Sequence, residues 1–186
     1  MFDLRSNFYE NGDFDRPAHA SHAFRLNQAI NQFNQARWCA ALAKIKSIIL
    51  RRSQALLDLE IIPANLVRSQ RYGGMKPVSI EQICGSLGRS TDFNKQFHPL
   101  SDRIQNRWVN IAMVRSQNLP LAPVELIQVG DCYFVQDGHH RISVACARGE
   151  SVIDAEIVIW ELSGELPWET QPLPASCRNL FERTPC

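Results

Sequence analysis

One stretch of the chain decides the fold, and it runs Tyr133-Phe134-Val135-Gln136-Asp137-Gly138-His139-His140-Arg141-Ile142-Ser143-Val144-Ala145. Its first three residues are aromatic or β-branched and predict a strand. Gly138 then allows a tight turn and a close approach of the backbone to a ligand. The apolar residues from Ile142 onward predict a short, largely buried helix that ends at Gly149.

The turn between this strand and this helix predicts an anion-binding site. A glycine turn that leads into a helix places free backbone N–H groups and the positive end of the helix dipole at one point. His139, His140 and Arg141 lie in that turn, and the guanidinium of arginine can bind phosphate through two hydrogen bonds. Each residue alone has an ordinary explanation, such as Asp137 as a helix N-cap. Because they occur together, we interpret the turn as a phosphate-binding corner for a nucleotide.

The composition is typical of a globular protein in a reducing compartment. The 186 residues suit one domain plus an extension, with 45% hydrophobic and 21% charged residues. A net charge of +1 gives no general attraction to nucleic acid or to an acidic membrane. None of the six cysteines forms a Cys-x-x-Cys pair, which favours core thiols over a disulfide framework. Because no apolar run could span a bilayer and no signal segment is evident, we expect a cytoplasmic protein with no membrane partner.

Three segments are expected along the chain. Residues 1–62 comprise an irregular arm, up to residue 21, and a long amphipathic helix from Ser21 to about Leu59. Residues 63–162 form the nucleotide-binding domain, and residues 163–186 form a tail rich in proline and serine without a clear period.

The long helix carries two apolar stripes in sequence. The first comprises Leu26, Ile30 and Phe33, and the second comprises Trp38, Leu42, Ile45, Ile49, Leu56 and Leu59. We expect residues 22–59 either to dock on the core or to bind a second copy of the chain or another protein. The opposite side carries several Lys and Arg residues, but no aromatic residues alternate with them, so nucleic acid is not favoured as a partner.

Glycine and proline residues interrupt helices and strands, and their positions predict the bounds of the remaining elements. A connector is expected over 60–78, a strand from Pro77 to Ile83 and a glycine-bracketed turn from Gly85 to Ser90. A helix from Asp102 to about Asn118 follows, in which Arg107 could reach a site or pair on the surface. The last elements are a hairpin (Val124–Val129, Gly130-Asp131, Cys132–Gln136) and a strand from Val152 to near Trp160. The fold class is therefore α+β.

Residues 77–160 resemble the ParB N-terminal/sulfiredoxin-like superfamily, and within it a bacterial ParB-like subgroup with an Asp-Gly-His-His-Arg motif. Besides the opening stretch, the resemblance is carried by Leu56-Leu57-Asp58-Leu59, Ile83-Cys84-Gly85-Ser86, Gly88-Arg89, Asp92-Phe93 and Arg107-Trp108. It implies a small mixed sheet with packed helices, to which this chain adds the long N-terminal helix. It also implies nucleotide binding, with ATP, ADP or CTP and Mg²⁺ as the expected cofactors.

Members of that superfamily differ at the glycine turn. Partition proteins carry Gly-Glu-Arg-Arg and use CTP, sulfiredoxins carry Gly-Cys-His-Arg and use ATP, and free-serine kinases carry Asp-Gly-x-His-Arg. This chain has His139 where the first two have glutamate or cysteine, so sulfiredoxin and partition chemistry are not expected. Asp137, Gly138, His140 and Arg141 match the kinase pattern.

The expected function is a nucleotide-dependent phosphotransferase or phosphohydrolase. Its expected cofactor-binding residues are Gly138, His140, Arg141, Ile142 and Arg89. Its expected catalytic residues are Asp137, His139 and His140, with Asp92 as a further candidate base. No third ligand accompanies the two histidines, so no metal-ligand set is predicted.

Two other function classes stay open. One is a non-catalytic nucleotide-sensing switch that acts through the N-terminal helix. The other is a DNA-associated protein, including a ParB-like nuclease, which the near-neutral charge and the lack of an aromatic platform do not favour.

Overall fold

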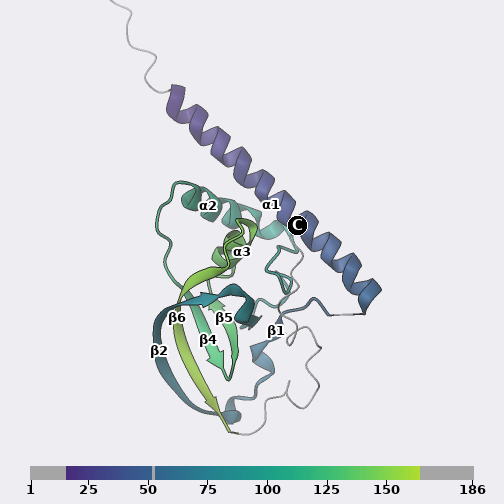
Figure 1. Cartoon of the computed structure of the whole chain (residues 1–186), viewed down its shortest axis with the longest axis vertical. Coiled ribbons are helices and arrows are strands. Elements are labelled where there is room, and N and C mark those ends of the chain that lie inside the picture. Colours follow the sequence, from purple (N-terminus) through teal and green to yellow (C-terminus); the bar gives the residue numbers. More distant parts are fainter. Residues whose placement is uncertain (1–15, 52, 164–186) are drawn as a thin grey trace, which may run out of the picture.

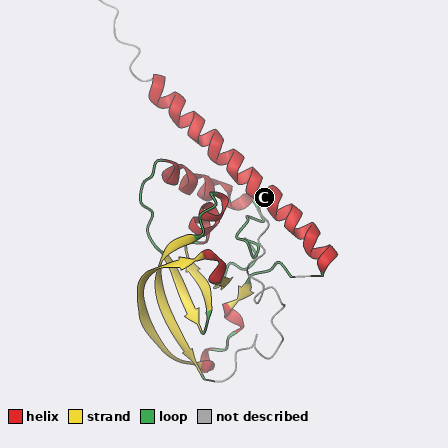
Figure 2. Ribbon diagram, viewed as in Figure 1, coloured by secondary structure: helices red, strands yellow, loops and turns green. Residues whose placement is uncertain are grey.

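The computed structural model describes residues 16–51 and 53–163, with side chains from residue 21 onward. Within these residues a six-stranded mixed sheet packs against two short helices, and a long helix crosses them (Figures 1 and 2). The expected α+β class, with a small mixed sheet, packed helices and a long N-terminal helix, is confirmed. The arm up to residue 15 and the tail from residue 164 lie outside the described residues.

The sheet has the strand order β1-β3-β5-β4-β6-β2. The strands are β1 (Leu57–Asp58), β2 (Val67–Ser79), β3 (Ile83–Ser86), β4 (Val124–Val129), β5 (Cys132–Asp137) and β6 (Val152–Leu162). Strands β1, β3 and β5 run parallel, whereas β4 pairs antiparallel with β5 in the predicted hairpin. Strand β6 runs parallel to β4 and antiparallel to the edge strand β2. The sheet centre, β5, therefore carries the stretch that decides the fold.

The helices are α1 (Arg16–Leu50), α2 (Gln105–Ser116) and α3 (His139–Ala147). Short 3-10 turns cover Leu59–Ile61, Ala64–Leu66, Ile80–Gln82 and Asp102–Ile104. Trp108 of α2 is fully buried, stacks edge-on against Phe33 of α1, and donates a hydrogen bond of 2.9 Å to the Ser143 hydroxyl of α3. One aromatic residue thus joins the three helices.

Apolar clusters occupy both faces of the sheet. The larger one lies between the sheet and the helices and includes Phe33, Phe93, Trp108, Leu126 and Ile142. The smaller one joins the other face to the segment after β1 and includes Leu59, Ile62, Ile127, Val129 and Phe134. Two of the expected core thiols, Cys39 and Cys84, are buried. In the described part of the chain, no helix has both the length and the hydropathy needed to cross a bilayer.

The predicted bounds of the long helix are wrong at both ends. It begins at Arg16, inside the expected arm, because Pro17 suits a first helical turn. It ends at Leu50 rather than near Leu59, and Arg51 then adopts a left-handed conformation with φ of 49°. Leu56 and Leu59 are buried in the two core clusters instead of extending the helical stripe.

The predicted connector over 60–78 is also wrong, because most of it is strand β2. Gly73-Gly74 forms an irregularity in the ladder with β6, where Gly74 has φ of 85°, rather than a hinge. Pro77 is tolerated because β2 is an edge strand. The strand expected from Pro77 to Ile83 is divided: β2 ends at Ser79, a 3-10 turn follows, and β3 starts at Ile83.

Candidate functional site

The candidate site is built around the turn between β5 and α3. Gly138 between them has φ of 99°, a conformation that side chains rarely adopt. A Cβ atom there would lie 2.5 Å from Cγ1 of Val124. The turn therefore requires glycine both for its backbone conformation and for its packing against β4.

The start of α3 offers backbone donors to a ligand. The first helical hydrogen bond runs from the amide of Ile142 to the carbonyl of Gly138, at 3.0 Å. The amides of His139, His140 and Arg141 precede that bond, and Gly138 provides no side-chain cap for them. Together with the positive end of the helix dipole, these amides are the local structure on which the prediction of an anion site rests.

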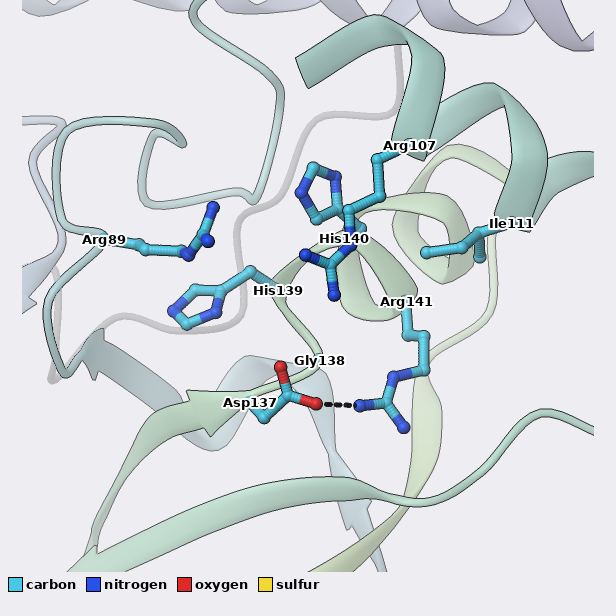
Figure 3. Close-up of a pocket in the computed structure, with 8 residues that line it drawn as sticks. All are labelled: Arg89, Arg107, Ile111, Asp137, Gly138, His139, His140 and Arg141. Atoms are coloured by element: carbon cyan, nitrogen blue, oxygen red, sulfur yellow. Dashed lines mark hydrogen bonds and ion pairs between the residues drawn. The ribbon is translucent and has the colours of Figure 1, made fainter. Parts of the chain in front are cut away.

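A small hollow lies in front of these amides (Figure 3). It is lined by Arg89, Arg107, Ile111, Asp137, Gly138, His139, His140 and Arg141, and its cavity volume is about 30 Å³. Pockets for drug-sized ligands usually measure about 300–1,000 Å³. The hollow therefore suits a phosphate group better than a whole nucleotide.

His139 is held in place by Ser86 of β3. Its ring is 3% exposed, stacks on Phe93, and places Nε2 2.6 Å from the Ser86 hydroxyl oxygen. The same oxygen accepts a hydrogen bond of 3.2 Å from the amide of Arg89. Ser86 thus couples the loop that carries Arg89 to the first residue of α3. The sequence placed Ser86 in the glycine-bracketed turn but gave no sign of this contact.

His140 contains a buried polar atom that lacks a partner. The residue is 5% exposed, its ring meets the edge of Phe93, and Nδ1 has no hydrogen-bond partner among the described residues. A buried polar atom without a partner is destabilising, so such atoms are rare in native proteins. His140 is also one of the residues that line the hollow.

Both histidines are neutral at pH 7. Burial, followed by the positive charge of Arg89 and the neighbouring His140, lowers the pKa of His139 to about 4. Burial, followed by Arg107 and Arg89, also lowers the pKa of His140 to about 4. The rings are therefore hydrogen-bonding groups, while the arginines provide the positive charge.

Arg141 is engaged by the protein itself. Its guanidinium donates to the carbonyls of Ala122 and Pro123 at 2.7 and 2.6 Å, and to the carboxylate of Asp137 at 2.5 Å. This geometry favours a structural role, in which Arg141 ties α3 to the segment before β4. Ile142, also expected to bind the cofactor, has a fully buried side chain and an amide bonded to Gly138. These contacts do not test the expectation that Arg141 and Ile142 bind the cofactor.

Two other arginines are better placed to meet an anion. Arg107 projects from α2 into the hollow, as Figure 3 shows, and no hydrogen bond or ion pair with another described residue engages its guanidinium. Arg89 has a single long ion pair of 3.4 Å with Asp92. The sequence left open whether Arg107 reaches a site, and the structure brings it to the predicted corner.

Asp137 faces the hollow from the end of β5. One of its oxygens binds Arg141, and Figure 3 shows the other directed toward the hollow. No group of three or more His, Cys, Asp and Glu side chains that could hold a metal ion occurs among the described residues. A single carboxylate together with ligand phosphates is a usual way to hold Mg²⁺, and Asp137 fits that arrangement.

Comparison with known proteins gives no relatives: no family model, no curated protein and no solved structure matches this chain.

Proposed function

We propose that this protein binds a nucleotide by its terminal phosphate in the hollow at the start of α3, and transfers or hydrolyses that phosphate. The observation that carries the proposal is the partnerless Nδ1 of His140, buried beside an uncapped helix start. The resemblance to nucleotide-binding ParB/sulfiredoxin-like proteins supports the choice of ligand.

The charges of the hollow support a phosphate ligand. Arg141 is balanced by Asp137, and Arg89 is partly balanced by Asp92. Arg107 has no such counter-charge among the described residues, and the helix start adds a partial positive charge. A phosphate oxygen in the hollow would receive backbone N–H groups, a guanidinium and an imidazole N–H together.

The size of the hollow limits how much of the nucleotide it holds. With a cavity volume of about 30 Å³ it would hold no more than the terminal phosphate, and the sugar and base would lie on the surface outside it. ATP, ADP and CTP are therefore all candidates, since the base is not enclosed. Mg²⁺ bound to the phosphates would neutralise charge on the phosphate oxygens.

The reaction needs a base next to the phosphate. The acceptor's hydroxyl oxygen forms a new bond to phosphorus as the bond to the leaving oxygen breaks, and a carboxylate takes the hydroxyl proton. Asp137 is the best-placed candidate, because one of its oxygens faces the hollow. His139 already bonds Ser86, so we assign it to positioning the site.

A thermal-shift panel tests binding. We expect ATP, ADP, CTP, GTP or inorganic phosphate, with and without Mg²⁺, to raise the melting temperature by a few degrees, since 100 Kd of ligand adds about 2.7 kcal/mol to stability. Arg107→Ala should abolish the shift. The matched control Arg103→Ala removes an equally charged, exposed residue four positions earlier that does not line the hollow. If no nucleotide and no phosphate shifts the melting temperature, the proposal is wrong.

An assay of phosphate release from the bound nucleotide distinguishes an enzyme from a nucleotide-sensing switch. An enzyme should release inorganic phosphate, or phosphorylate an acceptor, at a rate that Asp137→Asn lowers by at least 100-fold without abolishing binding. Binding without turnover would instead favour the second candidate, a nucleotide-sensing switch. The exposed apolar stripe on α1 is the observation that favours this alternative. In either case we place the protein in the cytoplasm, where nucleotides are available.

A further inference from the structure

The last turns of the long helix α1 leave large apolar side chains in solvent. No residue from 41 to 50 is buried, and this end of the helix extends past α2 and α3 in Figure 1. The apolar side chains of this end that share one side of the helix are between 53% and 74% exposed, and they are Trp38, Leu42, Ile45, Ile48 and Ile49. We call these five residues the outer patch. An exposed apolar patch of this kind marks an interaction site.

The outer patch occupies one side of the helix and is confined to its end. At about 100° per residue, its members lie within a sector of roughly 120°, away from the buried side that includes Ala40. Phe24, much earlier on the same side, is exposed as well. Between Phe24 and the patch that side is polar and carries Asn27, Asn31 and Asn34. The contact surface therefore begins at Trp38.

Basic residues lie on both flanks of the outer patch. Lys44 and Lys46 are exposed, and each lies about 100° from the centre of the patch, on opposite sides. Neither lysine forms an ion pair with another described residue. Helix α1 contains no acidic residue, and the exposed Arg51 follows its last turn. The surface is thus apolar along its centre and positively charged at its edges.

This arrangement favours an anionic lipid surface as the occupant. A helix that lies in a membrane interface directs its apolar side toward the acyl chains, while Lys and Arg side chains beside it reach the headgroup phosphates. The indole of Trp38 also suits the boundary between headgroups and acyl chains. A fluid lipid surface can cover a convex helix without the shaped groove that a folded partner would need.

The same charges argue against two other occupants. A second copy of α1 would bring lysines of like charge together, with no acidic residue on the helix to balance them. A nucleic acid binds mainly through its phosphates. It would meet the apolar patch first, because the patch lies between Lys44 and Lys46.

The expectation of no membrane partner rested on the lack of a spanning segment and on the small net charge. A helix that lies flat on a membrane needs no spanning segment. The charge that matters is local, because salt screens electrostatic attraction beyond about 10 Å. Around the outer patch this charge is positive, although the whole chain carries only +1.

We propose that the end of α1 binds an anionic membrane surface, with the outer patch among the acyl chains and Lys44 and Lys46 at the phosphates. The helix lies parallel to the membrane plane. The sheet lies on the aqueous side, because the patch faces away from the buried side of α1. The contact is one short helix, so binding is reversible and is weakened by salt.

Flotation of the full chain with lipid vesicles tests the proposal. The wild-type protein should float with vesicles of phosphatidylcholine and phosphatidylserine. It should stay at the bottom of the gradient with vesicles of phosphatidylcholine alone. High salt should release it from the anionic vesicles.

One pair of variants tests the apolar contribution. Ile45→Glu/Ile49→Glu should abolish flotation. Ile61→Glu/Met75→Glu is the matched control, because it makes the same change of charge at two similarly exposed residues outside α1, and it should float like the wild type. Since all four side chains are exposed, both variants should keep the melting temperature of the wild type. If the first variant fails to fold, Ile49→Glu alone replaces it, with the same expected loss of flotation.

A second pair tests the basic flanks. Lys44→Gln/Lys46→Gln should raise the concentration of anionic lipid needed for half-maximal binding by about tenfold or more. The matched control Arg68→Gln/Arg103→Gln removes two exposed positive charges outside α1 and should change that concentration by less than about twofold.

Three results would overturn the proposal. A wild-type chain that does not float with anionic vesicles would leave an acidic protein as the occupant of the patch. Equal flotation with neutral and anionic vesicles would remove the role of the lysines. Flotation that persists in Ile45→Glu/Ile49→Glu would place the lipid contact elsewhere in the chain.

Discussion

The two adjacent histidines are the most informative residues of the site. They are buried, neutral at pH 7 and next to two arginines, yet Nδ1 of His140 has no partner among the described residues. A purely structural histidine would be expected to have its hydrogen bonds satisfied. The missing hydrogen bond destabilises the folded state, and under the proposed function a phosphate ligand would supply it.

The histidine pair makes stability depend on pH. In the unfolded chain each histidine has a pKa near 6.5, whereas burial lowers the folded pKa of each to about 4. Well above pH 6.5 neither state binds these protons, so the two histidines cause no loss of stability there. Between pH 6.5 and 4 the unfolded chain takes up protons that the folded protein does not, and stability falls, by up to about 1.4 kcal/mol per pH unit for each histidine.

Urea unfolding at pH 7.5 and pH 5.0 measures this effect. We expect a lower free energy of unfolding at pH 5.0, by roughly 1–4 kcal/mol. The double variant His139→Gln/His140→Gln should lose most of this difference. An equal difference in the variant would show that other groups cause it.

Gly138 can be tested against a second glycine in the same kind of conformation. Gly149 has φ of 75° but has nothing within 4 Å of its missing Cβ, whereas a Cβ on Gly138 would overlap Val124. Gly149→Ala should therefore cost only the backbone strain, about 1 kcal/mol. Gly138→Ala should cost about 3 kcal/mol in chemical denaturation, because packing strain is added. Equal costs would contradict the tight packing of the turn.

At the scale of elements, Arg141 joins α3 to the segment before β4. Lysine has no planar fork, so Arg141→Lys cannot satisfy Asp137 and both carbonyls together. We expect a loss of about 1–3 kcal/mol in the free energy of unfolding. Arg71→Lys is the control, since Arg71 pairs with Glu161 on an exposed surface and should change stability by less than about 0.5 kcal/mol. A similar small effect at Arg141 would count against its structural role.

The elements that were predicted correctly from the sequence are those whose defining residues are neighbours in the chain. The strand, glycine turn and helix around Gly138, and the hairpin at Gly130, follow from residues that are neighbours in the chain. Strand β2 could not be found in this way, because its ladder with β6 outweighs the local preference of Gly73-Gly74 and Pro77 for turns. The end of α1 was missed because the apolar spacing continues to Leu59 although the helix stops at Leu50.

The site was only partly predictable for the same reason. Asp137 to His140 were found because they are consecutive, and Arg89 because glycine precedes it. Ser86 and Arg107 come from β3 and α2, and only the packing of those elements on α3 brings them to the histidines and the hollow. Arg141 has the residue type of a phosphate ligand, but its engagement with two carbonyls depends on the path of the chain before β4.

In the molecule as a whole, one side of α1 packs on the helix that carries part of the site, while its other side carries exposed apolar residues. Phe33 packs on Trp108, and Arg37 forms an ion pair of 2.5 Å with Asp102, just before α2. Because α2 carries Arg107, the inner side of α1 contributes indirectly to the shape of the hollow. The two sides of α1 should therefore respond differently to substitution.

Phe33→Ala and Trp38→Ala test this difference. The first removes a fully buried ring and should cost about 3–5 kcal/mol and weaken phosphate binding as α2 loosens. The second removes an exposed ring and should leave both the monomer's stability and its phosphate binding unchanged. Thermal unfolding and phosphate titration provide both readouts. A large stability loss in Trp38→Ala would contradict the exposed position of Trp38.

The most direct test of the phosphate site is an NMR titration that follows backbone amides while inorganic phosphate or ATP is added. The largest shifts should occur at the amides of His139, His140 and Arg141, and they should saturate. The same titration of Arg107→Ala should require at least a tenfold higher ligand concentration, whereas Arg103→Ala should behave as the wild type. If these three amides do not shift, or if the shifts are distributed over the basic surface and do not saturate, the start of α3 is not a phosphate site.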